Sequence, residues 1–322
     1  MIKILKKIIK KNLFNYLRKE NRKIKDLIIN FKIDLNILDI GATGGIQKKW
    51  HLIEEILNVS LVEANKNSSF GNNKFKSKKI ITQLFSSKSN ELKKFYITKY
   101  SWCSSVDKPN YSHLNKFKGK IGFFTNEGFK IEKALEIKTT TVDDCFIDEM
   151  LDFIKIDAEG HHIDILKGAG SKMEELLGLE VECEFFQLRE NQKMYFDVIN
   201  YLEKYDFEFI DFLNIHRWER DKFRYTGQPQ HSDILFLKKP EDIINKFNEK
   251  KISQEKLLKY IIILSVYNRS DLIKFINDNL DKKIVNDFKL SEIYNLTEKK
   301  LKRLNKMSHI ENIISNAINN EI

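Results

Sequence analysis

The chain has 322 residues, of which 42% are hydrophobic and 32% are charged, a composition that suits a folded protein with a sizeable core. Three prolines and twelve glycines argue against long linkers, and no apolar run reaches the length of about 18 residues that a membrane-spanning helix needs. The formal charge is +10, but residues 1–32 contain eleven basic and two acidic side chains. The rest of the chain is therefore almost neutral, which argues against a protein whose whole surface binds nucleic acid.

Residues 1–32 are predicted to form a basic amphipathic helix. Ile2, Leu5 and Ile9 recur at helical spacing, and lysines occupy the opposite side. The sequence leaves two interpretations of this helix open. It lies on an anionic membrane through residues 1–20, or it packs on the body of the protein. Lysines interrupt every apolar stretch of the segment, so we expect no secretory signal.

The cysteines indicate the compartment. The chain has three, far apart and without a CxxC motif, which fits a reducing environment. We therefore expect a cytoplasmic protein, with peripheral contact at the inner face of the membrane as the alternative that the basic helix leaves open.

A glycine-rich turn follows the first predicted strand, residues 35–40. A helix is expected at about 47–57, and the next strand ends at Glu63. The glycines are spaced GxxGG, whereas a dinucleotide pyrophosphate needs GxGxxG. Asp39 ends the first strand, where it would repel a pyrophosphate and favour the ammonium and sulfonium of S-adenosylmethionine.

Glu63 lies at the end of the second strand, where a carboxylate can accept hydrogen bonds from both hydroxyls of a ribose. The alternative is a tight turn with two incidental acids. The predicted cofactor-binding residues are Asp39, Gly41, Ala42, Thr43, Gly44, Gly45, Glu63 and Ser86.

Strands and helices alternate through the middle of the chain. Further strands are predicted at 80–85, 94–98, 134–141, 153–157, 179–186, 207–212 and 233–239. Helices are predicted to start after Thr141 and to span 161–166, 171–178 and 194–205. This alternation predicts an α/β fold with a doubly wound, mostly parallel sheet. From about Ile244 the chain becomes polar, with helices expected near 255–280 and 291–319.

The stretch "FIKIDAEGHHIDILKGA", residues 153–169, places charges at the end of an apolar strand. Side chains alternate along a strand, so Lys155 and Asp157 share one face. Glutamates alternate in the same way on the following strand. The structural interpretation is that Lys155 is a buried cation neutralised by Glu182 or Glu184.

Six motifs occur in an order that resembles the FkbM-type S-adenosylmethionine-dependent methyltransferases. They are "LDIGATGG", "LVEAN", "TTTVDD", "DFIKIDAEGHHIDILKGA", "LEVECEF" and "QHSDILFLK". The resemblance covers residues 35–240 and implies a class I methyltransferase fold with a seven-stranded sheet. It also implies methyl transfer to a hydroxyl, often on a sugar of a polysaccharide, glycolipid or natural product. The family usually has a glutamate where this chain has His162, so a role for that acid is not carried over.

The chain is therefore divided into a basic N-terminal helix (1–32), a methyltransferase domain (33–243) and a helical C-terminal extension (244–322). We expect an O-methyltransferase with a sugar or glycolipid acceptor and no nucleic-acid partner. RNA methylation, favoured only by the basic N-terminus, and a non-catalytic scaffold that binds S-adenosylmethionine are the alternatives. The C-terminal helices have three open roles, which are to cap the domain, to form a homodimer or to bind a partner enzyme.

The charged strand end is the expected acceptor site, because open α/β sheets bind ligands at the carboxyl ends of their strands. Methyl transfer to an alcohol needs a base for the hydroxyl proton, and a lysine can stabilise the forming alkoxide. The predicted catalytic residues are Asp157, Lys155, Glu159, His161 and His231, with Asp157 as the first choice of base.

The histidine pair gives little sign of a metal. His161 and His162 would point about 100° apart on a helix, and we expect at least one of them at the surface. No metal ligands are predicted, although Asp157, Glu159 and a histidine remain an alternative set. The aromatic residues expected to contact the acceptor are Trp102, Trp218 and Tyr225.

Overall fold

The computed structural model describes residues 19–66, 68–117, 120–121, 124–221 and 227–319. The chain folds into two compact units. One unit comprises residues 35–46 and 57–239, and the other includes residues 19–34, 47–56 and 240–319 among those described. Most of the helix predicted at the N-terminus, residues 1–18, lies outside the described residues, whereas residues 19–30 are helical.

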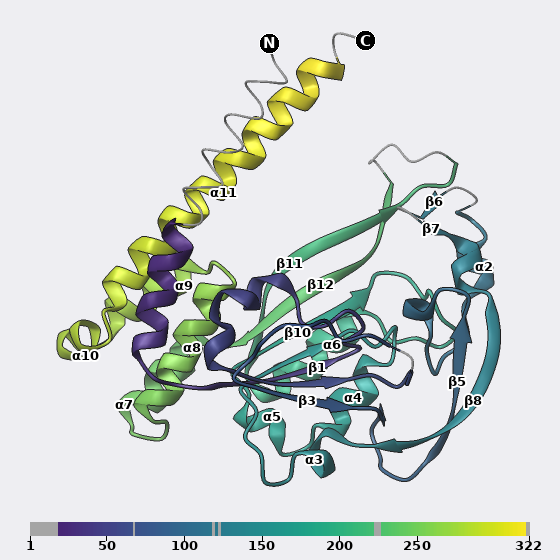
Figure 1. The fold of residues 1–322 in the computed structure, drawn as a ribbon, viewed down its shortest axis with the longest axis horizontal. Coiled ribbons are helices and arrows are strands. Elements are labelled where there is room, and N and C mark those ends of the chain that lie inside the picture. Colours follow the sequence, from purple (N-terminus) through teal and green to yellow (C-terminus); the bar gives the residue numbers. More distant parts are fainter. Residues whose placement is uncertain (1–18, 67, 118–119, 122–123, 222–226, 320–322) are drawn as a thin grey trace. The chain divides into compact units, whose positions relative to one another are not determined.

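The larger unit is built on a seven-stranded sheet with the order β11-β12-β10-β9-β1-β2-β3 (Figure 1). Its strands are β1 (Leu35–Ile40), β2 (Leu57–Val62), β3 (Ser77–Ile81), β9 (Phe153–Ile156), β10 (Gly178–Glu184), β11 (Phe207–Trp218) and β12 (Gln228–Lys238). Strands β10, β9, β1, β2 and β3 are parallel, and β12 is antiparallel to both β10 and β11. The predicted α/β fold with a mostly parallel seven-stranded sheet is confirmed.

Smaller sheets extend this unit. They are formed by β4 (Leu84–Phe85), β8 (Ile131–Thr140) and β5 (Leu92–Thr98), and by β6 (Lys120–Ile121) and β7 (Phe124–Thr125). The prediction of a single strand at 80–85 is therefore wrong. The chain leaves the main sheet after Ile81, and Leu84 pairs with β8 instead. The last two strands are longer than predicted, since their antiparallel pairing continues through polar residues.

One face of the main sheet is covered by short helices. The helices of this unit are α2 (Tyr111–Leu114), α3 (Val142–Cys145), α4 (His162–Gly168), α5 (Lys172–Glu175) and α6 (Tyr195–Leu202), with 3-10 turns at Ser101–Cys103, Asn126–Phe129 and Glu203–Tyr205. Leu38, Ile154 and Val181 of the sheet share a buried core with Leu166 of α4 and Val198 of α6. The Thr141 side chain accepts a hydrogen bond from the Asp144 amide, as predicted for a helix cap.

The smaller unit is helical. It contains a 3-10 helix, η1 (Lys48–Ile56), and the helices α7 (Pro240–Asn248), α8 (Gln254–Val266), α9 (Ser270–Asn279), α10 (Lys282–Asp287) and α11 (Leu290–Asn319). The helix predicted at 255–280 is interrupted between α8 and α9, where Asn268 takes a left-handed backbone conformation (φ 58°). Ile24 and Ile28 of the N-terminal helical segment are buried, and Glu20 pairs with Arg303. Within the described residues, no helix has the length and apolarity required to cross a membrane.

Candidate functional site

A cavity of about 660 Å³ lies at the carboxyl ends of β1, β2, β9 and β10 in the larger unit. Gly41 and Glu63 line it from the ends of β1 and β2, and Asp157 and Glu159 line it from the loop after β9. Members of both predicted groups of site residues therefore line one space. This is the edge at which open α/β sheets bind their ligands.

The glycine loop contributes Gly41 and Thr43 to the cavity wall. The Thr43 hydroxyl donates a hydrogen bond of 2.7 Å to Glu63 Oε2, so the loop is tied to the end of β2. The other predicted cofactor-binding residues are not among the described residues that line the cavity: Asp39, Ala42, Gly44, Gly45 and Ser86. Asp39 is buried within the sheet.

Gly41 brings the loop against β9. Its φ is +81°, and a Cβ placed on it would lie 1.7 Å from the Asp157 carbonyl oxygen. Gly41→Ala is expected to destabilise the protein by at least about 2 kcal/mol, because left-handed backbone strain and steric overlap add. Denaturant unfolding measures this effect. Gly44→Ala is the matched control, because its φ is +90° but no atom lies within 4 Å of its Cβ. Equal destabilisation by the two substitutions would contradict the steric part of this argument.

Lys155 is paired within the sheet, but with other acids than predicted. Its Nζ lies 2.8 Å from Asp157 Oδ2 and 3.9 Å from Asp39 Oδ1. The prediction of Glu182 or Glu184 as its partner is wrong, because Asp39 and Glu180 are the residues beside Lys155 in the strand register. Burial opposes the charge on Lys155, but Asp157 and Asp39 outweigh it and raise the pKa of the lysine.

The same contact sets the charge of Asp157, whose side chain is 35% exposed. Burial disfavours the carboxylate, but the Lys155 ammonium and a hydrogen bond with Glu182 together outweigh this effect and lower the pKa of Asp157. Asp157 is therefore ionised near neutral pH and can accept a hydrogen bond from a ligand in the cavity.

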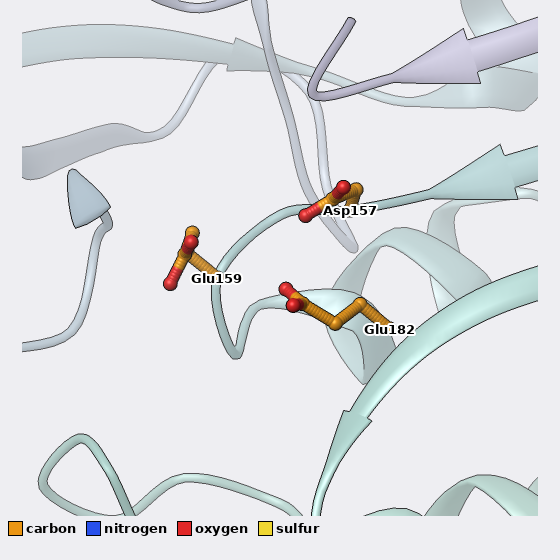
Figure 2. A group of neighbouring side chains, drawn as sticks. All are labelled: Asp157, Glu159 and Glu182. Atoms are coloured by element: carbon orange, nitrogen blue, oxygen red, sulfur yellow. The ribbon is translucent and has the colours of Figure 1, made fainter. Parts of the chain in front are cut away.

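Three carboxylates converge beside Asp157. Figure 2 shows Asp157 and Glu159 on the loop after β9 and Glu182 on the neighbouring strand β10. One oxygen of each lies within 4.8 Å of the other two. Burial raises the pKa of Glu159 to about 7 and that of Glu182 well above its usual range. A cluster of buried acids with strongly shifted pKa values is typical of a functional site.

Glu159 is held in place by an arginine that sequence reasoning missed. Glu159 has a φ of 51°, and its Oε2 lies 2.5 Å from Nη2 of Arg189. Arg189 is fully buried and also donates to the Cys103 carbonyl at 2.7 Å. Nothing in the sequence marks this arginine, because it lies in a loop 30 residues from its partner.

Glu182 faces His231, which lies in β12 rather than in the preceding loop. His231 Nδ1 is 2.7 Å from Glu182 Oε1, and both residues line the cavity. The His216 ring stacks on His231 with a centroid separation of 4.4 Å. Burial and the neighbouring His216 lower the pKa of His231 to about 3, so its imidazole is neutral at pH 7.

His161 and His162 are both buried, so the expectation that at least one lies at the surface is wrong. His161 lines the cavity, and its Nε2 is 3.1 Å from the Ser86 hydroxyl. His162 Nδ1 is 3.8 Å from Glu184 Oε2. Burial lowers the pKa of each imidazole to about 4, which keeps both neutral at pH 7.

Aromatic side chains form another part of the cavity wall. Trp102 and Trp218 both line the cavity. Trp102 is 48% exposed and stacks on Tyr100, whereas Trp218 is 5% exposed and packs edge-on against Phe117. Tyr225, the third aromatic residue predicted to contact the acceptor, lies outside the described residues.

Comparison with known proteins identifies one family. The model of the methyltransferase FkbM domain matches residues 39–209, which is more than half of the chain. No curated protein and no solved structure matches the chain. The matched range begins at Asp39 and contains the glycine loop, Glu63, the loop after β9 and the β10 acids.

Proposed function

The chain belongs to the FkbM methyltransferase family, and we propose that it transfers a methyl group from S-adenosylmethionine to a sugar hydroxyl of a polysaccharide, glycolipid or natural-product precursor. One observation carries the proposal. A single cavity is lined by Thr43 and Glu63 at one pair of strand ends and by Asp157, Glu159 and His161 beyond the next. Donor and acceptor would thus lie side by side, as a direct methyl transfer requires.

The first half of the cavity suits S-adenosylmethionine. Glu63 is placed to accept hydrogen bonds from the ribose hydroxyls once these displace the Thr43 hydroxyl from it. The acids around the cavity favour a ligand that carries an ammonium and a sulfonium. The same negative charge, with Glu63 beside the glycine loop, disfavours a dinucleotide pyrophosphate.

The second half suits an alcohol between a carboxylate and aromatic rings. Asp157, kept ionised by Lys155, would orient the acceptor hydroxyl and receive its proton. The hydroxyl oxygen attacks the methyl carbon, so that a C–O bond forms while the C–S bond of the sulfonium breaks. Trp102 offers an exposed ring face for the apolar side of a sugar.

Glu63→Ala is expected to weaken binding of S-adenosylhomocysteine, the demethylated product, by about 1.5–3 kcal/mol, because a charge-assisted hydrogen bond is lost. This corresponds to about 10- to 150-fold in Kd and is measured by calorimetry. Glu149→Ala is the control, since Glu149 is exposed and pairs with Lys79. An unchanged Kd for Glu63→Ala would remove this residue from the cofactor site, and NAD binding in place of S-adenosylhomocysteine would contradict the cofactor.

The acceptor class is tested with labelled S-adenosylmethionine. The protein is incubated with fractionated cell glycans, lipids and RNA, and the fraction that gains the label is identified. We expect the label in glycans or glycolipids. Label confined to RNA, or binding of S-adenosylmethionine with no transfer to any fraction, would contradict the proposal.

A further inference from the structure

We propose that Asp157, Glu159 and Glu182 bind a divalent cation in the acceptor half of the cavity. The inference rests on the proposed function only for the role of the ion, because its binding can be measured without methyl transfer. The cation would be Mg²⁺, Mn²⁺ or Ca²⁺, since an all-carboxylate site favours hard cations.

The spacing of the three acids fits such an ion. One oxygen from each lies within 4.8 Å of the other two, and Figure 2 shows the carboxylates around a common space between β10 and the loop after β9. Oxygens on opposite sides of a Ca²⁺ ion are about 4.6–5.2 Å apart, at twice the metal–oxygen distance.

Two of the three carboxylates are also oriented by a cationic side chain from outside the group, and the third lies beside a neutral histidine. Lys155 Nζ contacts Asp157 Oδ2, Arg189 Nη2 contacts Glu159 Oε2, and His231 Nδ1 lies beside Glu182 Oε1. One oxygen of each acid takes part in these contacts. Outer partners that fix the orientation of ligating carboxylates are characteristic of metal sites.

Glu184 gives an independent indication of a missing ligand. Its side chain is 2% exposed, and its Oε2 lies 3.8 Å from His162 Nδ1 and has no hydrogen-bond partner among the described residues. Glu184 lies on the same face of β10 as Glu182 and lines the same cavity. A buried carboxylate oxygen without a partner is costly, and a cation with its bound water would supply one.

A divalent cation would add positive charge to a group of acids whose cationic neighbours are Lys155 and Arg189. It would also lower the pKa of an acceptor hydroxyl bound to it, so that a carboxylate in the same group can receive the proton as the methyl carbon bonds to oxygen.

The test measures Mn²⁺ binding to the chelator-treated full chain by electron paramagnetic resonance. We expect one ion per chain, displaced by Mg²⁺ or Ca²⁺, with Kd raised at least about tenfold in Glu182→Gln and in Glu159→Gln. Glu149→Gln is the matched control, because Glu149 is an exposed acid paired with Lys79 outside the cavity. Should Glu159→Gln fail to fold because Arg189 loses its partner, Glu182→Gln still decides the result.

Absence of Mn²⁺ binding at millimolar concentration would overturn the inference, and so would equal binding by the wild type and both cavity variants. Calorimetry with S-adenosylhomocysteine on the same samples separates this inference from the proposed function. Product binding without Mn²⁺ binding overturns the cation site alone. Mn²⁺ binding without product binding supports the site and contradicts the proposed cofactor.

Discussion

Asp157→Asn is expected to reduce methyl-transfer turnover by about 10²–10⁴-fold, the usual contribution of a positioned acid–base group. The amide keeps the shape of the side chain but removes the charge that Lys155 stabilises at 2.8 Å. Affinity for S-adenosylhomocysteine should change by less than about threefold, because Asp157 lies in the part of the cavity proposed for the acceptor. Turnover with labelled S-adenosylmethionine and calorimetry with the product measure the two quantities.

Lys155→Met is the comparison for this result. Lys155 is buried and does not belong to the described cavity wall, so its loss acts through Asp157 and Asp39. If Lys155 has only a structural role, the variant should lose stability and lose activity in proportion to its unfolded fraction. A folded Lys155→Met variant that is still slow would assign it an electrostatic role. Near-normal turnover of Asp157→Asn would refute Asp157 as the base and direct the same test to Glu159, His161 and His231.

Arg189→Met is expected to lower the free energy of unfolding by about 3 kcal/mol or more, because it leaves a largely buried carboxylate unpaired. Arg189 is fully buried and contacts both Glu159 and the Cys103 carbonyl. Methionine retains much of the apolar stem of arginine, so that the loss of charge dominates. Guanidinium chloride unfolding, followed by circular dichroism, measures the change.

The double variant Arg189→Met/Glu159→Gln is the control for this prediction. Replacing the glutamate by a neutral amide removes the unpaired charge, so the double variant should recover part of the lost stability. A coupling free energy of about 1–3 kcal/mol is expected for two groups in direct contact. Strictly additive effects would show that the ion pair does not account for the destabilisation.

The strand ends on the glycine-loop side of the cavity could be predicted from the sequence, because their signals are local. The strand Leu35–Ile40, the GxxGG turn and the position of Glu63 follow from apolar runs and glycine spacing within about 30 residues. The same holds for Lys155 and Asp157, whose shared face follows from strand alternation. Boundaries were less predictable where pairing with another strand continues through polar residues, as in β11 and β12.

The sequence by itself therefore determined the α/β class, the FkbM resemblance and the residues at each strand end. Only the tertiary structure decided which charges meet. The strand order β1-β9-β10-β12 places Lys155 between Asp39 and Glu180 and brings His231 beside Glu182. The fold also brings Arg189 to Glu159. Such contacts depend on strand order, register and loop paths, which arise from packing of the whole sheet, so residues far apart in sequence carry no local sign of them.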